Sequence, residues 1–246
     1  EFLKRGIHCM VEKPIATIVE QAEDLIRLAR ENHCVLQVGH IERYNAAIRR
    51  LRELLDRPGF IECHRLGPFS SRVADVGVVL DLMIHDIDIV LQLVDSPIVS
   101  VDAMGVSILT DKEDIATVRI KFQNGCTANL TASRVSFKVQ RKLRVFQRDS
   151  YVSVDYAKQA MQYYQRIPRP GATDGPKAEI RRKRIRLQKE DMLTLELGDF
   201  IKAVRAGAKP NVTGEHARDA LGLAVQIARL IQENDVVQRL SWSEQP

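Results

Sequence analysis

The sequence lacks the features that mark membrane proteins and disulfide-rich proteins. No uncharged apolar run reaches the roughly 18 to 20 residues of a membrane span, and no stretch resembles a secretory signal peptide. The four cysteines form no Cys-x-x-Cys pair, and they do not combine with histidines at the spacing of a zinc site. We therefore expect a cytoplasmic protein with reduced cysteines, no bound metal and no membrane partner.

Aromatic residues are also scarce, and their scarcity bears on nucleic-acid binding. They make up 5% of the 246 residues, whereas the formal net charge is +5. The densest basic run, at positions 181–186, has no neighbouring aromatic side chains on which bases would stack. We interpret this run as the solvated edge of a sheet and expect no nucleic-acid partner.

The first half of the chain carries the pattern of a parallel sheet. Apolar runs at 7–11 and 34–38 flank a stretch with helical periodicity that begins near residue 19. Strand, helix and strand within about thirty residues form a βαβ crossover, and ligands bind beyond the carboxyl ends of such strands. Two polar clusters lie at those ends, namely Glu12-Lys13-Pro14 and the segment 39–45, GHIERYN.

The first residues, EFLKR followed by Gly6, have the pattern of a helix end with a glycine C-cap. Because a helix does not begin at its end, we expect a further N-terminal portion before this sequence.

A second conspicuous stretch, residues 77–94, reads GVVLDLMIHDIDIVLQLV and predicts a buried helix. At about 100° per residue, its polar side chains Asp81, His85, Asp88 and Gln92 share a stripe about 60° wide. Two interpretations stay open. The stripe is an internal network that fixes the helix, or it lines a pocket in which His85 exchanges a proton and Asp81 orients it.

The remainder of the chain predicts a sheet with helices. Strand patterns occupy 60–66, 99–109, 116–122, 126–135, 142–146, 151–156 and 180–187, with an Asn124-Gly125 hairpin turn between two of them. The Pro- and Gly-rich segment 167–177 is expected to be a loop, and residues 191–206 and 213–231 predict helices. This half is thus an α+β domain with a mostly antiparallel sheet.

The order of these motifs resembles the Gfo/Idh/MocA family of NAD(P)-dependent oxidoreductases. The resemblance rests on a strand ending in Glu12-Lys13-Pro14, a second strand ending in Gly-His with Arg43-Tyr44-Asn45, Asp81-x-x-x-His85, and Thr213-Gly214-Glu215 before a helix. It implies that residues 1–44 are the C-terminal remnant of a dinucleotide-binding Rossmann domain. Residues 45–246 would form an α+β domain for substrate binding and oligomerisation, with a large open sheet and helices on one face.

The resemblance also implies roles for individual residues. His85 would exchange the substrate hydroxyl proton, Lys13 would hold the reacting oxygen and the cofactor ribose, and Asp81 would orient the substrate or tune His85. Glu12, Lys13 and Pro14 would contact NAD or NADP, with Pro14 in a rigid or cis turn. The expected substrate contacts are His40, Arg43, Tyr44, Arg72 and Asp81, although an ion pair is an equal alternative for Arg43.

The expected reaction is hydride transfer between a nicotinamide cofactor and a hydroxyl or ketone carbon of a sugar. The segments GHIERYN and VVLDLMIHDIDIV are most similar to members that act on nucleotide-linked amino sugars such as UDP-N-acetylglucosamine. Two alternatives stay open, a dehydrogenase of a free sugar, inositol or another small carbonyl compound, and a non-catalytic sensor or assembly module. An open sheet with one apolar face also predicts a homodimer or homotetramer.

Overall fold

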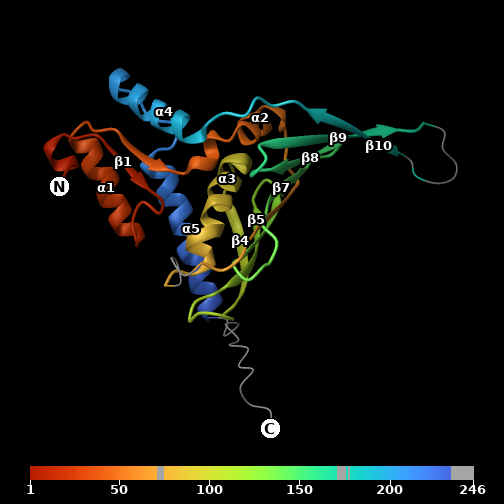
Figure 1. Cartoon of the computed structure of the whole chain (residues 1–246), viewed down its shortest axis with the longest axis horizontal. Helices are drawn as coiled ribbons and strands as arrows, with labels where there is room; N and C mark the ends of the chain where they lie inside the picture. The colour runs from red at the N-terminus through yellow and green to blue at the C-terminus, as the bar shows by residue number, and fades with distance from the viewer. Residues whose placement is uncertain (71–74, 171–175, 177, 234–246) are drawn as a thin grey trace, which may run out of the picture.

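A computed structural model describes residues 1–70, 75–170, 176 and 178–233. A small parallel unit lies on one side of the molecule and a large open sheet lies on the other (Figure 1). Within the described ranges, no helix is both long enough and apolar enough to cross a membrane.

The small unit is the predicted βαβ crossover. Strand β1 (Cys9–Glu12) pairs in parallel with β2 (Leu36–Gly39), and α1 (Val19–Glu31) connects them. Before β1, the 3-10 turn η1 (Leu3–Arg5) ends at Gly6 with φ of 71°, the left-handed cap that the sequence predicts. One face of the two strands packs on α1, where Ala22, Ile26 and Val38 are buried.

The second unit is an eight-stranded sheet in the order β10-β9-β8-β7-β3-β6-β5-β4. Every neighbouring pair is antiparallel except β3 with β6, which run parallel. The strands are β3 (Phe60–Leu66), β4 (Ile98–Val106), β5 (Ile115–Phe122), β6 (Thr127–Ser133), β7 (Gln140–Phe146), β8 (Ser150–Asp155), β9 (Ala160–Pro168) and β10 (Ala178–Ile185). The predicted mostly antiparallel sheet is therefore confirmed.

Strand alternation gives this sheet one apolar face. In β5, for example, Ala116, Val118 and Ile120 are buried while Thr117, Arg119 and Lys121 are exposed. The apolar face packs against η4 (Val79–Met83), α3 (Ile84–Val94) and α5 (Gly214–Glu233), which form the second layer. Among the described residues, no helix covers the opposite face (Figure 1).

Helix α5 belongs to both hydrophobic cores. Its first turns bury Ala217 and Leu221 in the core of the small unit, and its later turns bury Ala224, Ile227 and Ile231 against the sheet. Helix α4 (Met192–Ala206) begins at Asp191, whose side chain accepts a hydrogen bond from Thr194 N, and ends at Gly207 with φ of 60°. The helix α2 (Ala46–Leu54) begins after Asn45, whose side chain accepts a hydrogen bond from Ala47 N.

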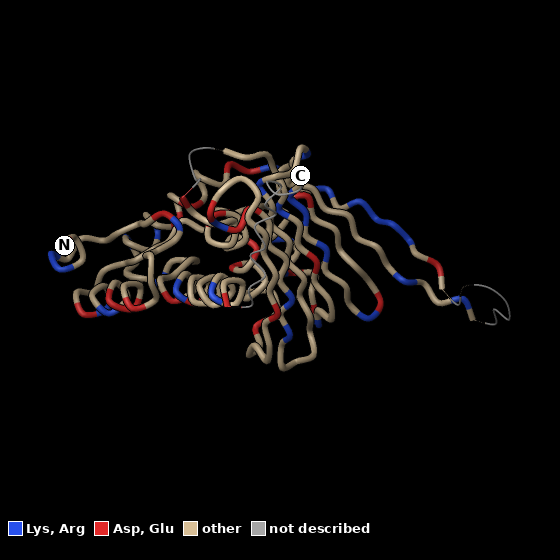
Figure 2. The backbone as a smooth tube through the Cα atoms, turned by 90° about the horizontal axis from the view of Figure 1, so that it is seen from below, with Lys and Arg blue, Asp and Glu red and all other residues tan. Residues whose placement is uncertain are grey.

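Strands β9 and β10 form the outer edge of the sheet. Strand β9 was not predicted, and Ile167 and Pro168 at its end contradict the expected loop at 167–177, of which residues 171–175 and 177 lie outside the described residues. The basic run forms β10, the edge strand, and its cations lie along the outer border of the sheet (Figure 2). The predicted edge position of this run is thus confirmed.

Candidate active site

The carboxyl ends of β1 and β2 bring the two polar clusters together. Because the strands are parallel and Glu12 is in register with Gly39, the segments Lys13-Pro14 and His40 leave the sheet at one edge. The Lys13–Pro14 peptide bond is cis, one of the two geometries that the sequence allows. A Cβ on Gly39 would lie 2.8 Å from Glu12 Oε2, so any other residue at position 39 would displace this carboxylate.

Lys13 meets Asp81 across the two units. Its Nζ donates to the Asp81 main-chain oxygen at 2.6 Å and to Asp81 Oδ1 at 3.4 Å. The two side chains are 19% and 20% exposed, so the pair is sheltered and still accessible. Asp81 lies in η4, a π-helical turn before α3, and such wide turns often occur at functional sites. This contact joins two residues that are 68 positions apart.

His85 lies one turn after Asp81 and is half-buried. Its Nδ1 is buried and has no hydrogen-bond partner among the described residues. Burial lowers the pKa of His85 well below its usual value, and the positive charges of Arg65 and Lys13 lower it further. The lowered pKa favours the neutral imidazole near pH 7, and a neutral imidazole has one unprotonated nitrogen that can accept a proton.

His40 directly follows the end of strand β2. It is 1% exposed, and neither ring nitrogen has a hydrogen-bond partner in the described part of the chain. Burial lowers the pKa of His40, although the nearby Asp88 carboxylate, 3.9 Å from its Nδ1, opposes this. His40 is thus a buried group at the strand end, and its lowered pKa favours the neutral imidazole.

Arg43 and Tyr44, two of the expected substrate contacts, are already paired within the protein. Arg43 forms a bidentate ion pair with Asp88, at 2.7 Å from Nε and 2.5 Å from Nη2, and both are buried. The Gln92 side chain lies against the same guanidinium. Tyr44 donates its hydroxyl to Asp199 of α4 at 2.8 Å. The ion-pair alternative for Arg43 is what the structure shows.

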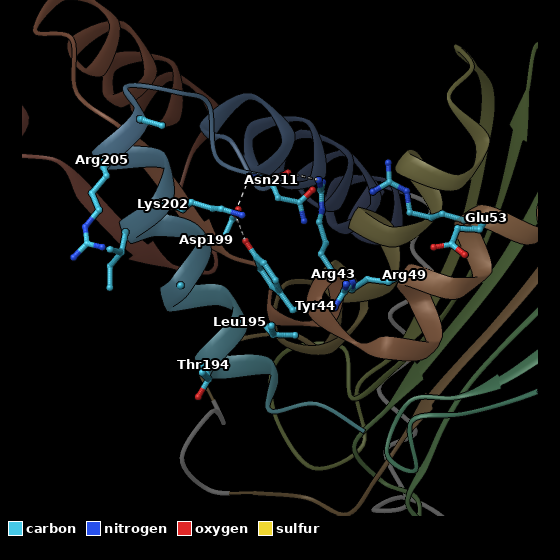
Figure 3. A pocket seen from close by; sticks show the side chains of 14 residues that line it. Arg43, Tyr44, Arg49, Glu53, Thr194, Leu195, Asp199, Lys202, Arg205 and Asn211 are labelled. Atoms are coloured by element: carbon cyan, nitrogen blue, oxygen red, sulfur yellow. Dashed lines mark hydrogen bonds between the residues drawn. The ribbon is translucent and has the colours of Figure 1, made fainter. Parts of the chain in front are cut away.

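A cavity of about 1080 Å³ opens beside η2 (Ile41–Tyr44), between α2 and α4 (Figure 3). Its lining includes Arg43, Tyr44, Arg52, Asp199, Lys202 and Arg205, whereas Lys13, Asp81 and His85 lie elsewhere. The cavity is therefore separate from the lysine, aspartate and histidine cluster. Arg72, the remaining expected substrate contact, lies outside the described residues.

Several residues near the cluster escaped the sequence analysis. Arg65 of β3 is buried and binds Asp86, the residue after His85, through Nε at 2.8 Å, and it binds Glu42 at 3.2 Å. The alternating pattern of β3 could have identified Arg65, because position 65 falls on the buried face of that strand. Glu196 of α4 is also buried, and burial raises its pKa to about 7, with Glu12 adding to the effect. A carboxylate within an apolar helical pattern was the signal there.

No group of three or more histidine, cysteine, aspartate or glutamate side chains in the described ranges has the arrangement of a metal site. The cluster of Lys13, Asp81 and His85 combines a cation, a carboxylate and an imidazole near the end of the parallel strands.

Fold and site together define a class, the oxidoreductases in which a dinucleotide-binding unit is followed by an α+β domain with a large open sheet. Residues 1–40 match the oxidoreductase family with an NAD-binding Rossmann fold, and residues 48–149 match the GFO/IDH/MocA C-terminal domain. The chain belongs to the Gfo/Idh/MocA family of NAD-binding oxidoreductases, as its motifs indicate.

Several relatives are similar over most of the chain. A UDP-N-acetylglucosamine 3-dehydrogenase of Acidithiobacillus ferrooxidans is 39% identical over 92% of this chain and 71% of that protein. A solved structure of the enzyme from this organism has a TM-score of 0.86 at 38% identity, covering 95% of this chain and 74% of that one. A myo-inositol 2-dehydrogenase of Thermotoga maritima is 23% identical over 92% of this chain and 71% of that protein.

Proposed function

We propose that this chain forms the catalytic cleft of a dehydrogenase that acts on a secondary hydroxyl, or the corresponding ketone, of a nucleotide-linked amino sugar. The observation that carries the proposal is the contact of Lys13 with Asp81, one helical turn before His85, whose pKa is lowered by burial. The nucleotide-linked substrate is supported by the 39% identity to a UDP-N-acetylglucosamine 3-dehydrogenase.

The residues have complementary roles in this proposal. When a secondary alcohol is oxidised, its O–H bond breaks and the proton needs an acceptor, which is the neutral His85 imidazole. Negative charge then develops on the oxygen, and Lys13 Nζ is the cation that stabilises it. Asp81 holds Lys13 through its carbonyl and its carboxylate, so it is a positioning residue for the ammonium group.

The residues at the end of β1 fit a nicotinamide cofactor. Glu12 and Lys13 offer an acceptor for ribose hydroxyls and a cation, and Gly39 makes room for the Glu12 carboxylate. Pro14 follows in the cis turn. When bound, the cofactor supplies the hydride acceptor or donor, which no side chain provides. His40 follows the end of β2, and burial lowers its pKa, which favours the uncharged imidazole at this edge.

The proposed substrate is tested by measuring the activity of the full-length protein with several candidate substrates. Absorbance of the reduced nicotinamide is followed with UDP-N-acetylglucosamine, free N-acetylglucosamine, free sugars and myo-inositol, each with NAD and with NADP. We expect turnover with the nucleotide-linked sugar. Turnover with myo-inositol or a free sugar alone would contradict the proposed substrate, and failure to bind either cofactor would contradict the enzyme class.

We further propose that the protein is a homodimer or homotetramer that associates through the helix-free face of the sheet. Four half-buried rings, Phe60, Phe146, Tyr151 and Tyr164, stack on that face with centroid separations of 5.7, 5.1 and 4.2 Å. Such an aromatic row is typical of an interface.

The four free cysteines support a place in the reducing cytoplasm.

Light scattering on the purified protein tests this association. We expect a dimer or tetramer for the unchanged protein and a smaller species for Tyr151→Glu, because a charge would be buried between sheets. Gln21→Glu on exposed α1 is the control and is expected to leave the mass unchanged. A monomeric unchanged protein would contradict the association.

A further inference from the structure

Arg141, on strand β7, is a cation on the catalytic side of the sheet. Leu143 and Val145 of the same strand are buried against the helix layer. Because side chains alternate along a strand, Arg141 points to that same face, but it lies past the buried core and is exposed. Its guanidinium is therefore on the side where η4 and α3 carry Asp81 and His85, rather than on the helix-free face.

The pairing of β7 with β3 places Arg141 at the border of the catalytic cluster. Arg141 is in register with Arg65, which binds Asp86, the neighbour of His85 in sequence. The Arg141 carbonyl accepts from Tyr156 N at 3.0 Å, and the Arg65 guanidinium lies 5.2 Å from the centre of the Tyr156 ring. In agreement with this position, the charge of Arg141 contributes to the lowered pKa of His85.

Arg141 differs from the other cations of the cluster because no described carboxylate pairs with it. Arg65 is neutralised by Asp86 and Glu42, and Lys13 is held by Asp81. The Arg141 side chain has neither an ion pair nor a hydrogen bond within the described part of the chain. An arginine fork without a protein acceptor, next to a reaction centre, is suited to a phosphate group of a ligand.

We propose that Arg141 is a specificity-determining residue that binds the diphosphate of a nucleotide-linked sugar whose sugar ring lies at His85. This inference rests on the proposed function and deepens it, since it names the residue that would distinguish a nucleotide-linked sugar from a free one. Phosphate groups also occur in the nicotinamide cofactor, so the test must separate the two sources.

Kinetics of three variants of the full-length enzyme test the proposal. Arg141→Ala is expected to raise KM for UDP-N-acetylglucosamine about 10- to 100-fold, the size of a lost charge-assisted hydrogen bond, with kcat within about 3-fold. Arg141→Lys should retain part of the affinity, because lysine keeps the charge without the fork. Arg229→Ala is the control, since Arg229 is an exposed arginine of α5 that pairs with Glu233 and belongs neither to the catalytic cluster nor to the helix-free face of the sheet.

Two further measurements make the outcome decisive. The KM for the cofactor and the turnover of free N-acetylglucosamine should be the same in Arg141→Ala and the unchanged enzyme. A raised cofactor KM would assign the phosphate to the cofactor and overturn the proposal, as would an equal loss with both sugars or no loss at all.

If the unchanged enzyme turns over no sugar, the proposed function fails by itself, and calorimetric titration with uridine diphosphate decides the role of Arg141. Binding that Arg141→Ala weakens at least 10-fold supports the site. Equal binding, or no binding to the unchanged protein, overturns it.

Discussion

At the residue scale, the polar stripe of η4 and α3 combines the two roles that its sequence leaves open. Its beginning faces the candidate active site, where Asp81 holds Lys13 and His85 has a free nitrogen. Its end is structural, because Asp88 is paired with Arg43. Helical periodicity places these groups on one side of the helix, but it does not identify the partner of each, which comes from a distant segment.

The buried Arg43–Asp88 pair makes a testable contribution to stability. Asp88→Ala should lower the free energy of unfolding by about 3 to 5 kcal/mol, because it leaves the Arg43 charge buried without compensation. Urea denaturation measures this loss. The control is Asp24→Ala, which breaks an exposed ion pair with Arg27 and should cost under about 1 kcal/mol. Equal losses in the two variants would contradict the structural role of Asp88.

Because the pKa of Glu196 is raised, we expect the free energy of unfolding to depend on pH. Its pKa is raised to about 7 in the folded state, above the value of about 4.3 expected in the unfolded chain. The folded state therefore favours the protonated form, and stability is lost as the pH rises from the unfolded value through the folded one.

Glu196→Gln removes this loss. At pH 8 the variant should be more stable than the unchanged protein by on the order of 1 to 2 kcal/mol, with a smaller difference at pH 5. Urea denaturation at both pH values measures it, and exposed Glu23→Gln should show no pH-dependent difference. The idea fails if Glu196→Gln is no more stable at pH 8 than at pH 5, relative to the unchanged protein.

At the scale of elements, the sequence predicts those whose periodicity and end signals agree. The βαβ unit, the Asn124-Gly125 hairpin and the helix at 191–206 are confirmed. Strand β9 was missed because its residues, AMQYYQRIP, do not alternate in polarity, and its burial pattern does not alternate either. A strand near the sheet edge is defined by its neighbours, β8 and β10, rather than by its own pattern.

The beginning of η4 depends on the absence of a side chain at Gly77. A Cβ there would lie within 2.0 Å of Glu113 Oε1, and the same oxygen accepts from Val79 N at 3.2 Å. Gly77→Ala should displace Glu113 and cost about 1 to 3 kcal/mol, a loss that thermal unfolding detects. Gly67→Ala meets no atom within 4 Å and should leave the melting temperature nearly unchanged. A Gly77→Ala variant as stable as Gly67→Ala would contradict the close approach.

At the scale of the whole molecule, the candidate active site exists because two units meet. Lys13 comes from the end of the parallel strands and Asp81 and His85 from the helix layer of the large sheet, while α5 contributes to both cores and joins the units. The motifs predict the two units, and the resemblance predicts the three residues. The lysine-to-aspartate contact, the pairing of Arg43 and the position of Arg65 follow from packing across long sequence separations, which local patterns do not encode.

The central claim is that His85 and Lys13 act on a substrate hydroxyl. The most direct test measures oxidation of UDP-N-acetylglucosamine by the full-length His85→Ala variant, together with its affinity for the cofactor. The account predicts a loss of kcat of about 100-fold or more with cofactor binding retained. The control His33→Asn, at an exposed turn position with φ of 51° that asparagine tolerates, should keep full activity. Unchanged turnover by His85→Ala would contradict the account and favour a non-catalytic role for this chain.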